Sequence, residues 1–142
     1  MKNTVVLIDA NVVITYITGR DDPYKAASEK LMELCSAERI DGYLAFHSLS
    51  VIWYVLRKWP QSRRRKWLKT ICTVLTVTGA SQAEILSAIE NEAFADFEDC
   101  LQDKCAKTVQ ADYIVTGNIR DYRHSEIRAV TPDELLRIIG AD

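Results

Sequence analysis

The fold is decided by the stretch Val5-Val6-Leu7-Ile8-Asp9, which runs directly into Ala10-Asn11. A short apolar run of this kind is typical of a strand buried on both faces of a parallel sheet. The run ends in a carboxylate, and open α/β sheets bind their ligands outside the carboxyl ends of the strands. Asp9 therefore has two interpretations. It lies in a ligand site, or it caps the helix that follows, because Asp is a favoured N-cap residue.

Working outward from this strand, the chain alternates between predicted strands and predicted helices. Further strands are expected over residues 43–46, 73–78, 112–116 and 129–130. Helices are expected over residues 11–17, 22–37, 47–59 and 61–69. Three more helices are expected: one that starts at the capping box 81–84, one within residues 92–110 and one from residue 131 onward. This alternation predicts a parallel sheet with helices on both faces. The length of 142 residues indicates a single domain over residues 1–142.

The composition excludes several classes of protein. Apolar residues make up 48% and charged residues 27% of the chain, with no apolar run near the ~20 residues that span a bilayer. We therefore expect a cytoplasmic protein. The net charge of −2 means that any nucleic-acid binding comes from a local patch. The four cysteines form no C-x-x-C pair and only two histidines are present, which disfavours zinc and favours buried thiols.

Acidic residues gather at two further places. Asp96, Asp99 and Asp103 share one face of a predicted helix, with Phe97, Leu101 and Cys105 on a face that suits the core. The loop Thr116–Asp121 follows the second apolar strand, so its polar residues meet Asp9 at one edge of a parallel sheet. Oxygen ligands without Cys or His suit Mg²⁺ or Mn²⁺, which can activate water. The alternative is that the acids are solvated charges near a helix start.

At this point the sequence resembles the PIN-domain ribonucleases. The similar segments are Leu7–Val12, Asp96–Asp99 and Tyr113–Tyr122, and Val130–Glu134 is similar to that family's last strand and helix. The resemblance covers nearly the whole chain in the right order, and it is greatest to the bacterial branch that includes VapC-like toxins of toxin–antitoxin pairs. It implies a three-layer α/β/α sandwich with a mainly parallel central sheet. It also implies divalent-metal-dependent cleavage of RNA.

The resemblance assigns roles to particular residues. Asp9, Asp99 and Asp121 match catalytic acids, and the implied metal ligands are Asp9, Asp96, Asp99, Asn118 and Asp121. Whether Asn118 or Asp121 is the ligand from the loop stays open. Asn11 and Thr116 match polar residues that orient the site. The implied cofactor is Mg²⁺ or Mn²⁺, and the candidate partners are an RNA substrate, a cognate antitoxin protein and a second copy of the chain in a homodimer.

One position departs from the family. A Glu is usual on the helix after the second strand, and Val51 stands in its place. Ser48 or Ser50 is a candidate substitute through a water molecule, and Asp96 is a candidate substitute for the charge. The alternative is a catalytically degenerate module that binds RNA or protein. A haloacid-dehalogenase phosphatase also begins with a strand that ends in Asp, but it needs a second Asp two residues on, where this chain has Asn11.

The one dense basic run is Arg63-Arg64-Arg65-Lys66, and tryptophans are interleaved around it. Such a run could bind the phosphates of RNA, with an aromatic ring available for stacking on a base. The alternative is a solvated helix face with the tryptophans in the core, which we favour for the tryptophans. His47 is expected at a helix start, and His124 in a surface loop.

Overall fold

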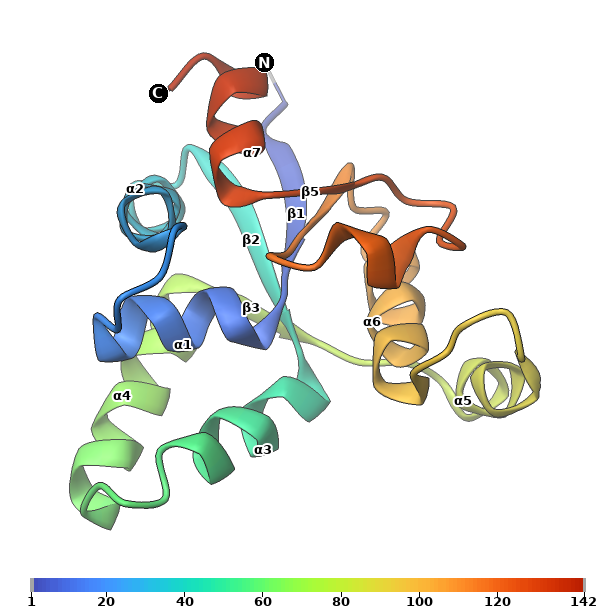
Figure 1. Ribbon diagram of the computed structural model, residues 1–142, viewed down its shortest axis with the longest axis horizontal. Coiled ribbons are helices and arrows are strands. Elements are labelled where there is room, and N and C mark those ends of the chain that lie inside the picture. The colour runs from blue at the N-terminus through green and yellow to red at the C-terminus, as the bar shows by residue number, and fades with distance from the viewer. Residues whose placement is uncertain (1, 142) are drawn as a thin grey trace.

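The computed structural model describes residues 2–141 and has a five-stranded sheet in the order β3-β2-β1-β4-β5 (Figure 1). Every strand pair is parallel. The elements are β1 (Thr4–Ile8), α1 (Ala10–Thr18), α2 (Lys25–Ser36), β2 (Ile40–Ala45), α3 (Phe46–Val55), α4 (Gln61–Val74), β3 (Thr76–Thr78), α5 (Gln82–Glu90), α6 (Phe97–Thr108), β4 (Tyr113–Val115), the 3-10 helix η1 (Ile119–Tyr122), β5 (Ala129–Val130) and α7 (Pro132–Ile139).

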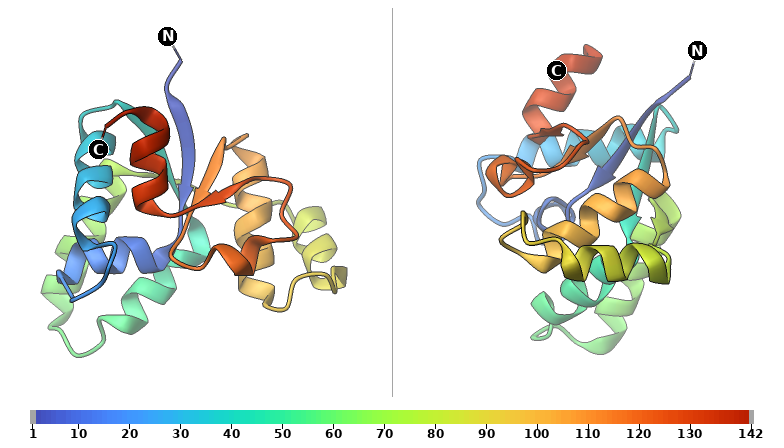
Figure 2. Two further views of the ribbon diagram at one scale, coloured as in Figure 1. Left: turned by 45° about the horizontal axis from the view of Figure 1, so that its top comes forward. Right: turned by 90° about the vertical axis from the view of Figure 1, so that its right-hand side faces the viewer.

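Helices cover both faces of the sheet, as predicted. Alternate side chains of β1 point to opposite faces. Val6 and Ile8 join the core formed with α1, α2, α4 and α7, whereas Val5 and Leu7 join the core formed with α5 and α6. Figures 1 and 2 show these two groups of helices on either side of β1 and β4. The predicted three-layer α/β/α sandwich is confirmed. Its central strand is apolar on both faces because neither face meets water.

The helix boundaries follow local chemistry that the sequence shows. Ser81 and Glu84 form the expected capping box at the start of α5. Thr131 caps α7, whose first residue is Pro132. Gly19 ends α1 with a φ of 63°, a left-handed conformation that glycine adopts without a steric penalty. These signals depend on neighbouring residues alone, so they were predictable.

The predicted strand over residues 73–78 was wrong at its start. Helix α4 continues to Val74 and β3 begins only at Thr76. The Thr73 hydroxyl donates to the carbonyl of Lys69, 2.9 Å away and one turn earlier. Burial of Ile71 and Leu75, four residues apart, holds this segment against the core at a helical spacing. The second strand also differs, because it begins at Ile40 and Phe46 already belongs to α3.

Helix α6 buries the predicted face only in part. Cys105 is buried and Leu101 packs against the core, as predicted, but Phe97 is 48% exposed and Cys100, Gln102 and Asp103 are also buried. Among the cysteines, Cys35, Cys100 and Cys105 are buried as expected, but Cys72 is exposed. Over residues 2–141, no helix combines the length and apolar character needed to cross a membrane. The unexpected burial of two polar side chains on α6 bears directly on the candidate site.

Candidate metal centre

The carboxyl ends of β1 and β4 lie side by side, as the sequence predicts for neighbouring parallel strands. Ile8 pairs with Val115, and the amide of Asp9 donates to the Val115 carbonyl at 2.9 Å. Thr116 then donates its hydroxyl to Oδ2 of Asp9 at 2.9 Å. Asp9 does occupy the N-cap position of α1, but its side chain makes no capping hydrogen bond. Its carboxylate is directed into the site instead.

Gln102 of α6 is a site residue that sequence reasoning missed. Its Nε2 lies 3.5 Å from Oδ1 of Asp9 and 3.3 Å from Oγ of Ser48. It therefore joins β1, α3 and α6 at one buried point. The signal was present, because Gln102 lies three residues after Asp99 and hence on the same face of a helix. In the sequence, a glutamine next to several acidic residues indicates no particular function. Its contact with Asp9 is evident only in the structure.

Asp96, Asp99 and Asp121 line one small pocket together with Arg120, Arg123 and His124. The pocket has a volume of about 110 Å³. Tyr122 is buried beneath it and donates its hydroxyl to Oδ1 of Asp99 at 3.3 Å. The structure thus brings α6 and the loop after β4 together around these carboxylates. The positive charge supplied here by Arg120 and Arg123 was not predicted.

The carboxylates of the site repel one another. Burial raises the pKa of Asp9, the hydrogen bond from Thr116 opposes that change, and the charge of Asp121 adds to it. The pKa of Asp99 rises to about 7, first through burial and then through the charges of Asp96, Asp121 and Asp9. Glu98 is affected in the same way, since burial and the charges of Asp96 and Asp9 raise its pKa. Such perturbed carboxyls are common at functional sites.

The remaining predicted residues occupy varied positions. Asp96 caps α6 and accepts from the Glu98 amide at 2.7 Å. Asn118 donates its backbone amide to the Thr116 hydroxyl at 3.0 Å. Asn11 is exposed on the first turn of α1. Ser48 is fully buried beside Gln102, whereas the Ser50 hydroxyl donates to the His47 carbonyl and is not brought to the site.

Val51 and Asp103 are not among the residues that line the pocket of Asp96, Asp99 and Asp121. Val51 is half-buried and packs against the larger core. Asp103 is buried, but it forms an ion pair of 3.2 Å with Lys107 and accepts a hydrogen bond from Ser125. Because Ser125 follows η1, this contact fastens the loop to α6. The expectation that Asp103 shares the acidic face of Asp96 and Asp99 is therefore replaced by a structural role.

A divalent cation fits the chemistry of this donor set. Asp9, Asp99 and Asp121 offer hard oxygen ligands. Among residues 2–141, none of these three carboxylates forms an ion pair. In the same range, no group of three or more His, Cys, Asp or Glu side chains is drawn together closely enough to hold a metal ion as it stands. The side chains would have to close around a cation to bind it.

The basic run lies in the first turns of α4, on the other side of β1 from α6 and its acids (Figure 1). Its arginines stack on aromatic rings. The guanidinium of Arg63 lies 3.7 Å from the ring centre of Trp59, and that of Arg64 lies 3.9 Å from the ring centre of Trp53. The tryptophans are half-buried, so they contribute both to the core and to this surface.

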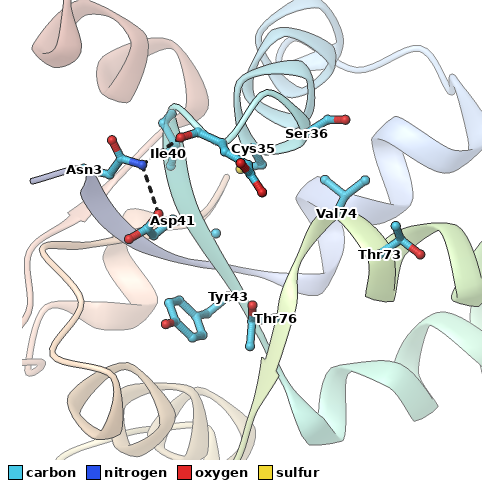
Figure 3. A pocket seen from close by; sticks show the side chains of 11 residues that line it. Asn3, Cys35, Ser36, Ile40, Asp41, Tyr43, Thr73, Val74 and Thr76 are labelled. Atoms are coloured by element: carbon cyan, nitrogen blue, oxygen red, sulfur yellow. Dashed lines mark hydrogen bonds between the residues drawn. The ribbon is translucent and has the colours of Figure 1, made fainter.

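A wider hollow of about 760 Å³ lies at the opposite, amino edge of the sheet (Figure 3). In Figure 3 the Asn3 amide reaches Oδ1 of Asp41, at 3.1 Å, across its floor. Cys35, Tyr43 and Thr76 also line it. None of the predicted acids belongs to its lining. The candidate site is therefore assigned by the convergence of carboxylates and not by the size of a hollow.

The chain belongs to the PIN domain family, whose model matches residues 5–120. A comparison with curated proteins finds no match. Among solved structures, a chain of VapBC2 from Rickettsia felis, bound to a DNA fragment from their promoter, has a TM-score of 0.67 at 15% identity and covers 90% of this chain and 98% of that one.

Two further solved structures share the fold. VapC20 of Mycobacterium tuberculosis, a toxin that cleaves the sarcin–ricin loop, has a TM-score of 0.59 at 13% identity, covering 77% of this chain and 86% of that one. PAE2754 of Pyrobaculum aerophilum has a TM-score of 0.65 at 16% identity, covering 99% of this chain and 100% of that one. At such low identity these likenesses establish the fold alone.

Proposed function

We propose that this PIN domain is an endoribonuclease that hydrolyses RNA phosphodiester bonds with Mg²⁺ or Mn²⁺. The observation that carries the proposal is the approach of Asp9, Asp99 and Asp121 at the carboxyl edge of β1 and β4, where none of the three forms an ion pair within residues 2–141. Burial, followed by the charges of Asp96, Asp121 and Asp9, raises the pKa of Asp99 to about 7, so the ionised metal-free site is unfavourable at neutral pH. A divalent cation would reverse that repulsion.

The side chains of the candidate site would have separate roles in this reaction. Asp9, Asp99 and Asp121 hold the ion, with Asp96 and Asn118 as additional oxygen ligands. A bound divalent ion supplies a reactive water and stabilises charge that develops on the phosphate. Thr116 fixes Asp9 by its 2.9 Å hydrogen bond and Tyr122 orients Asp99. Arg120 and Arg123, on the rim of the same pocket, bring positive charge to a phosphate group.

The basic run Arg63–Lys66 would bind the RNA backbone outside the reacting phosphate. Helix α3, ten residues and therefore about 15 Å long, leads from Ser48 beside Gln102 toward the loop that precedes this run. That separation suits a substrate of several nucleotides. Arginine stacked on tryptophan presents a flat charged surface to phosphates and bases. We also assign Asn11 to orienting the site, because it is exposed at the start of α1 next to Asp9.

We further propose that the protein is the toxin of a toxin–antitoxin pair. The likeness in fold to VapC20 and to a chain of VapBC2 supports this role. A cognate antitoxin would be one partner, and a second copy of the chain in a homodimer another. A cytoplasmic location also stays a prediction, as RNA and an antitoxin would be met there.

The decisive experiment is RNA cleavage with Mn²⁺ or Mg²⁺ by the wild type and by the variants Asp9→Asn and Asp99→Asn. We expect each variant to lose about 1,000-fold or more in rate, because several kcal/mol of charge stabilisation would be lost. Asp41→Asn is the matched control, since Asp41 is exposed at the opposite edge of the sheet. Equal cleavage by the wild type and the Asp9→Asn variant would contradict the assignment.

The second candidate is a degenerate PIN module that binds RNA or protein without cleaving RNA. It is favoured by one observation, the half-buried Val51 where the family usually has Glu. Calorimetric titration with Mn²⁺ separates the two functions. An enzyme binds the ion with an affinity that Asp9→Asn reduces, whereas a degenerate module shows no binding at millimolar metal.

A further inference from the structure

Gln102 has a polar side chain at a buried position where an apolar side chain would be expected to give greater stability. It is 1% exposed, between β1, α3 and α6. Its Nε2 donates to Asp9 and Ser48 at 3.5 and 3.3 Å, but among residues 2–141 its Oε1 has no hydrogen-bond partner. A buried amide oxygen without a partner costs free energy, because it loses its hydrogen bonds to water. An apolar side chain of equal length would fill the same space without that cost.

Residues that break a local rule in this way are expected at functional sites. The orphaned oxygen belongs to the same amide group whose Nε2 contacts Asp9, a candidate metal ligand. The partner of Asp9 on the other side, Thr116, is fully satisfied at 2.9 Å. The Nε2 contacts are longer and leave the amide free to tighten when the site closes, as hydrogen bonds in unloaded sites often do. No group among residues 2–141 donates a hydrogen bond to this oxygen, so it is available to a bound water or ligand.

We propose that Gln102 is a positioning residue of the metal centre, and this inference rests on the proposed function. Its Nε2 holds Asp9 and Ser48 in place, and its Oε1 is the acceptor for the hydration shell of the bound ion. In this arrangement Gln102 and Ser48 replace, by hydrogen bonds, the acid that is absent at Val51. Outer partners of this kind orient the ligands and tune affinity without touching the metal.

A purely structural role makes the opposite prediction. If Gln102 only bridges three elements, its loss leaves Ser48 unpartnered and lowers stability whether or not metal is present. If it is a positioning residue, its loss spares the metal-free fold and weakens metal binding. The two roles are separated by measuring stability and metal affinity on the same variants.

The test compares Gln102→Met with Gln82→Met, the same substitution at an exposed position of α5. Binding of Mn²⁺ is measured by calorimetry, and unfolding temperature is measured in chelator. We expect Gln102→Met to raise the Mn²⁺ dissociation constant about 10- to 100-fold, with an unfolding temperature in chelator equal to or above that of the wild type. Gln82→Met should change neither. Unchanged affinity would overturn the proposal, as would a fall in unfolding temperature without a loss of affinity.

Gln102→Glu is the second variant, and it keeps the proposal testable if Gln102→Met does not fold. It has the same size and retains oxygen acceptors, and its added negative charge beside the ion offsets the loss of the Nε2 donor, so we expect Mn²⁺ affinity at or above the wild-type value. Affinity below the wild-type value would contradict the proposal. Asp9→Asn, titrated in parallel, isolates the proposed function. If Asp9→Asn binds Mn²⁺ normally the metal site itself is refuted, whereas loss in Asp9→Asn alone refutes only the role of Gln102.

Discussion

Two buried aspartates of this fold differ in whether a positively charged side chain balances their charge. Asp9 is 8% exposed and Asp103 is 2% exposed. Asp103 has a positive partner, Lys107 at 3.2 Å, and a hydrogen bond from Ser125. Within residues 2–141 the side-chain partners of Asp9 are neutral, Thr116 at 2.9 Å and Gln102 at 3.5 Å. The charge of one aspartate is balanced within the chain, and the charge of the other is not.

This difference separates a structural carboxylate from a functional one. A buried charge that is not paired is costly, and the cost appears as a raised pKa. Burial raises the pKa of Asp9, and the neighbouring Asp121 raises it further. Asp103 instead fastens α6 to the segment around Ser125 and Ile127, whose amide donates to Ser125 Oγ at 3.0 Å. The contrast therefore predicts opposite responses to the same substitutions.

The largest effect is expected on stability without metal. Asp103→Asn should lower the free energy of unfolding by about 2 kcal/mol, less than for a fully buried pair, because Lys107 is 32% exposed and can be rehydrated. That is a fall of about 6 °C in melting temperature at this chain length. Asp9→Asn should leave the melting temperature equal or higher, since it removes an unbalanced charge. Thermal unfolding in chelator measures both, and similar losses for the two variants would break the comparison.

The pH dependence of stability should come from the carboxylates that have no positively charged partner, in particular Asp99. The pKa of Asp99 is about 7 in the folded protein, well above the ordinary value of 3.8. Between these two pH values the folded state holds the proton and the unfolded state has released it. Stability of the metal-free protein should therefore fall as pH rises from about 4 to 7, by about 1–2 kcal/mol after solvent screening.

Two conditions should abolish this fall. Asp99→Asn removes the titrating group, and saturating Mn²⁺ favours the ionised carboxylate and so opposes the burial and repulsion that raise its pKa. Unfolding curves across this pH range, with and without metal, provide the measurement. A fall that persists unchanged in Asp99→Asn would show that another group carries it.

A pair of hydroxyl deletions sharpens the comparison. Thr116→Val removes the hydrogen bond to Asp9 but keeps the shape of the side chain, and it should weaken Mn²⁺ binding about 10-fold. Ser125→Ala removes the hydrogen bond to Asp103 and should cost about 1 kcal/mol of stability without altering Mn²⁺ affinity. Calorimetry and thermal unfolding of both variants test whether one substitution affects only metal affinity and the other only stability. Loss of metal affinity in Ser125→Ala would contradict it.

The smallest effect concerns the basic run, which touches neither aspartate. Lys66→Ala should reduce RNA affinity a few-fold and lower the slope of affinity against salt concentration by about 1, with Mn²⁺ binding unchanged. Lys30→Ala, an exposed lysine on α2, is the matched control. Fluorescence anisotropy with a labelled RNA across salt concentrations gives the slope. Equal slopes for the two variants would remove the run from the binding surface.

The parts of the fold that could be predicted are those governed by neighbouring residues. The apolar run before Asp9, the cap at Ser81 and the Pro132 start of α7 all act within a few positions. The segment around Thr73 was misjudged because β-branched residues favour a strand locally, while packing of Ile71 and Leu75 imposed a helix. A contact between distant elements can override a weak propensity, and no local pattern reveals it.

The residues of the candidate site can also be divided into those that the sequence predicts and those that it does not. Asp9, Asp99, Asp121 and Thr116 could be proposed from the sequence because they follow strands or stand in a recognisable acidic helix start. Gln102 and Arg120 could not, since an amide and an arginine gain a role only from their neighbours in space. Asp103 carried the same residue type and helical spacing as its neighbours and still proved different. Its partner Ser125 lies in another part of the chain.

The sequence by itself determined the parallel sheet, its two helical layers and the edge at which the acids meet, because periodicity and strand ends are local properties. Tertiary structure alone decided which buried aspartate is balanced and which is not. That choice depends on whether a cation or a neutral side chain packs against the carboxylate. Lys107 happens to be near Asp103 in sequence, but Asp9 meets Gln102 and Thr116 only through the folding of α6 and β4 onto β1.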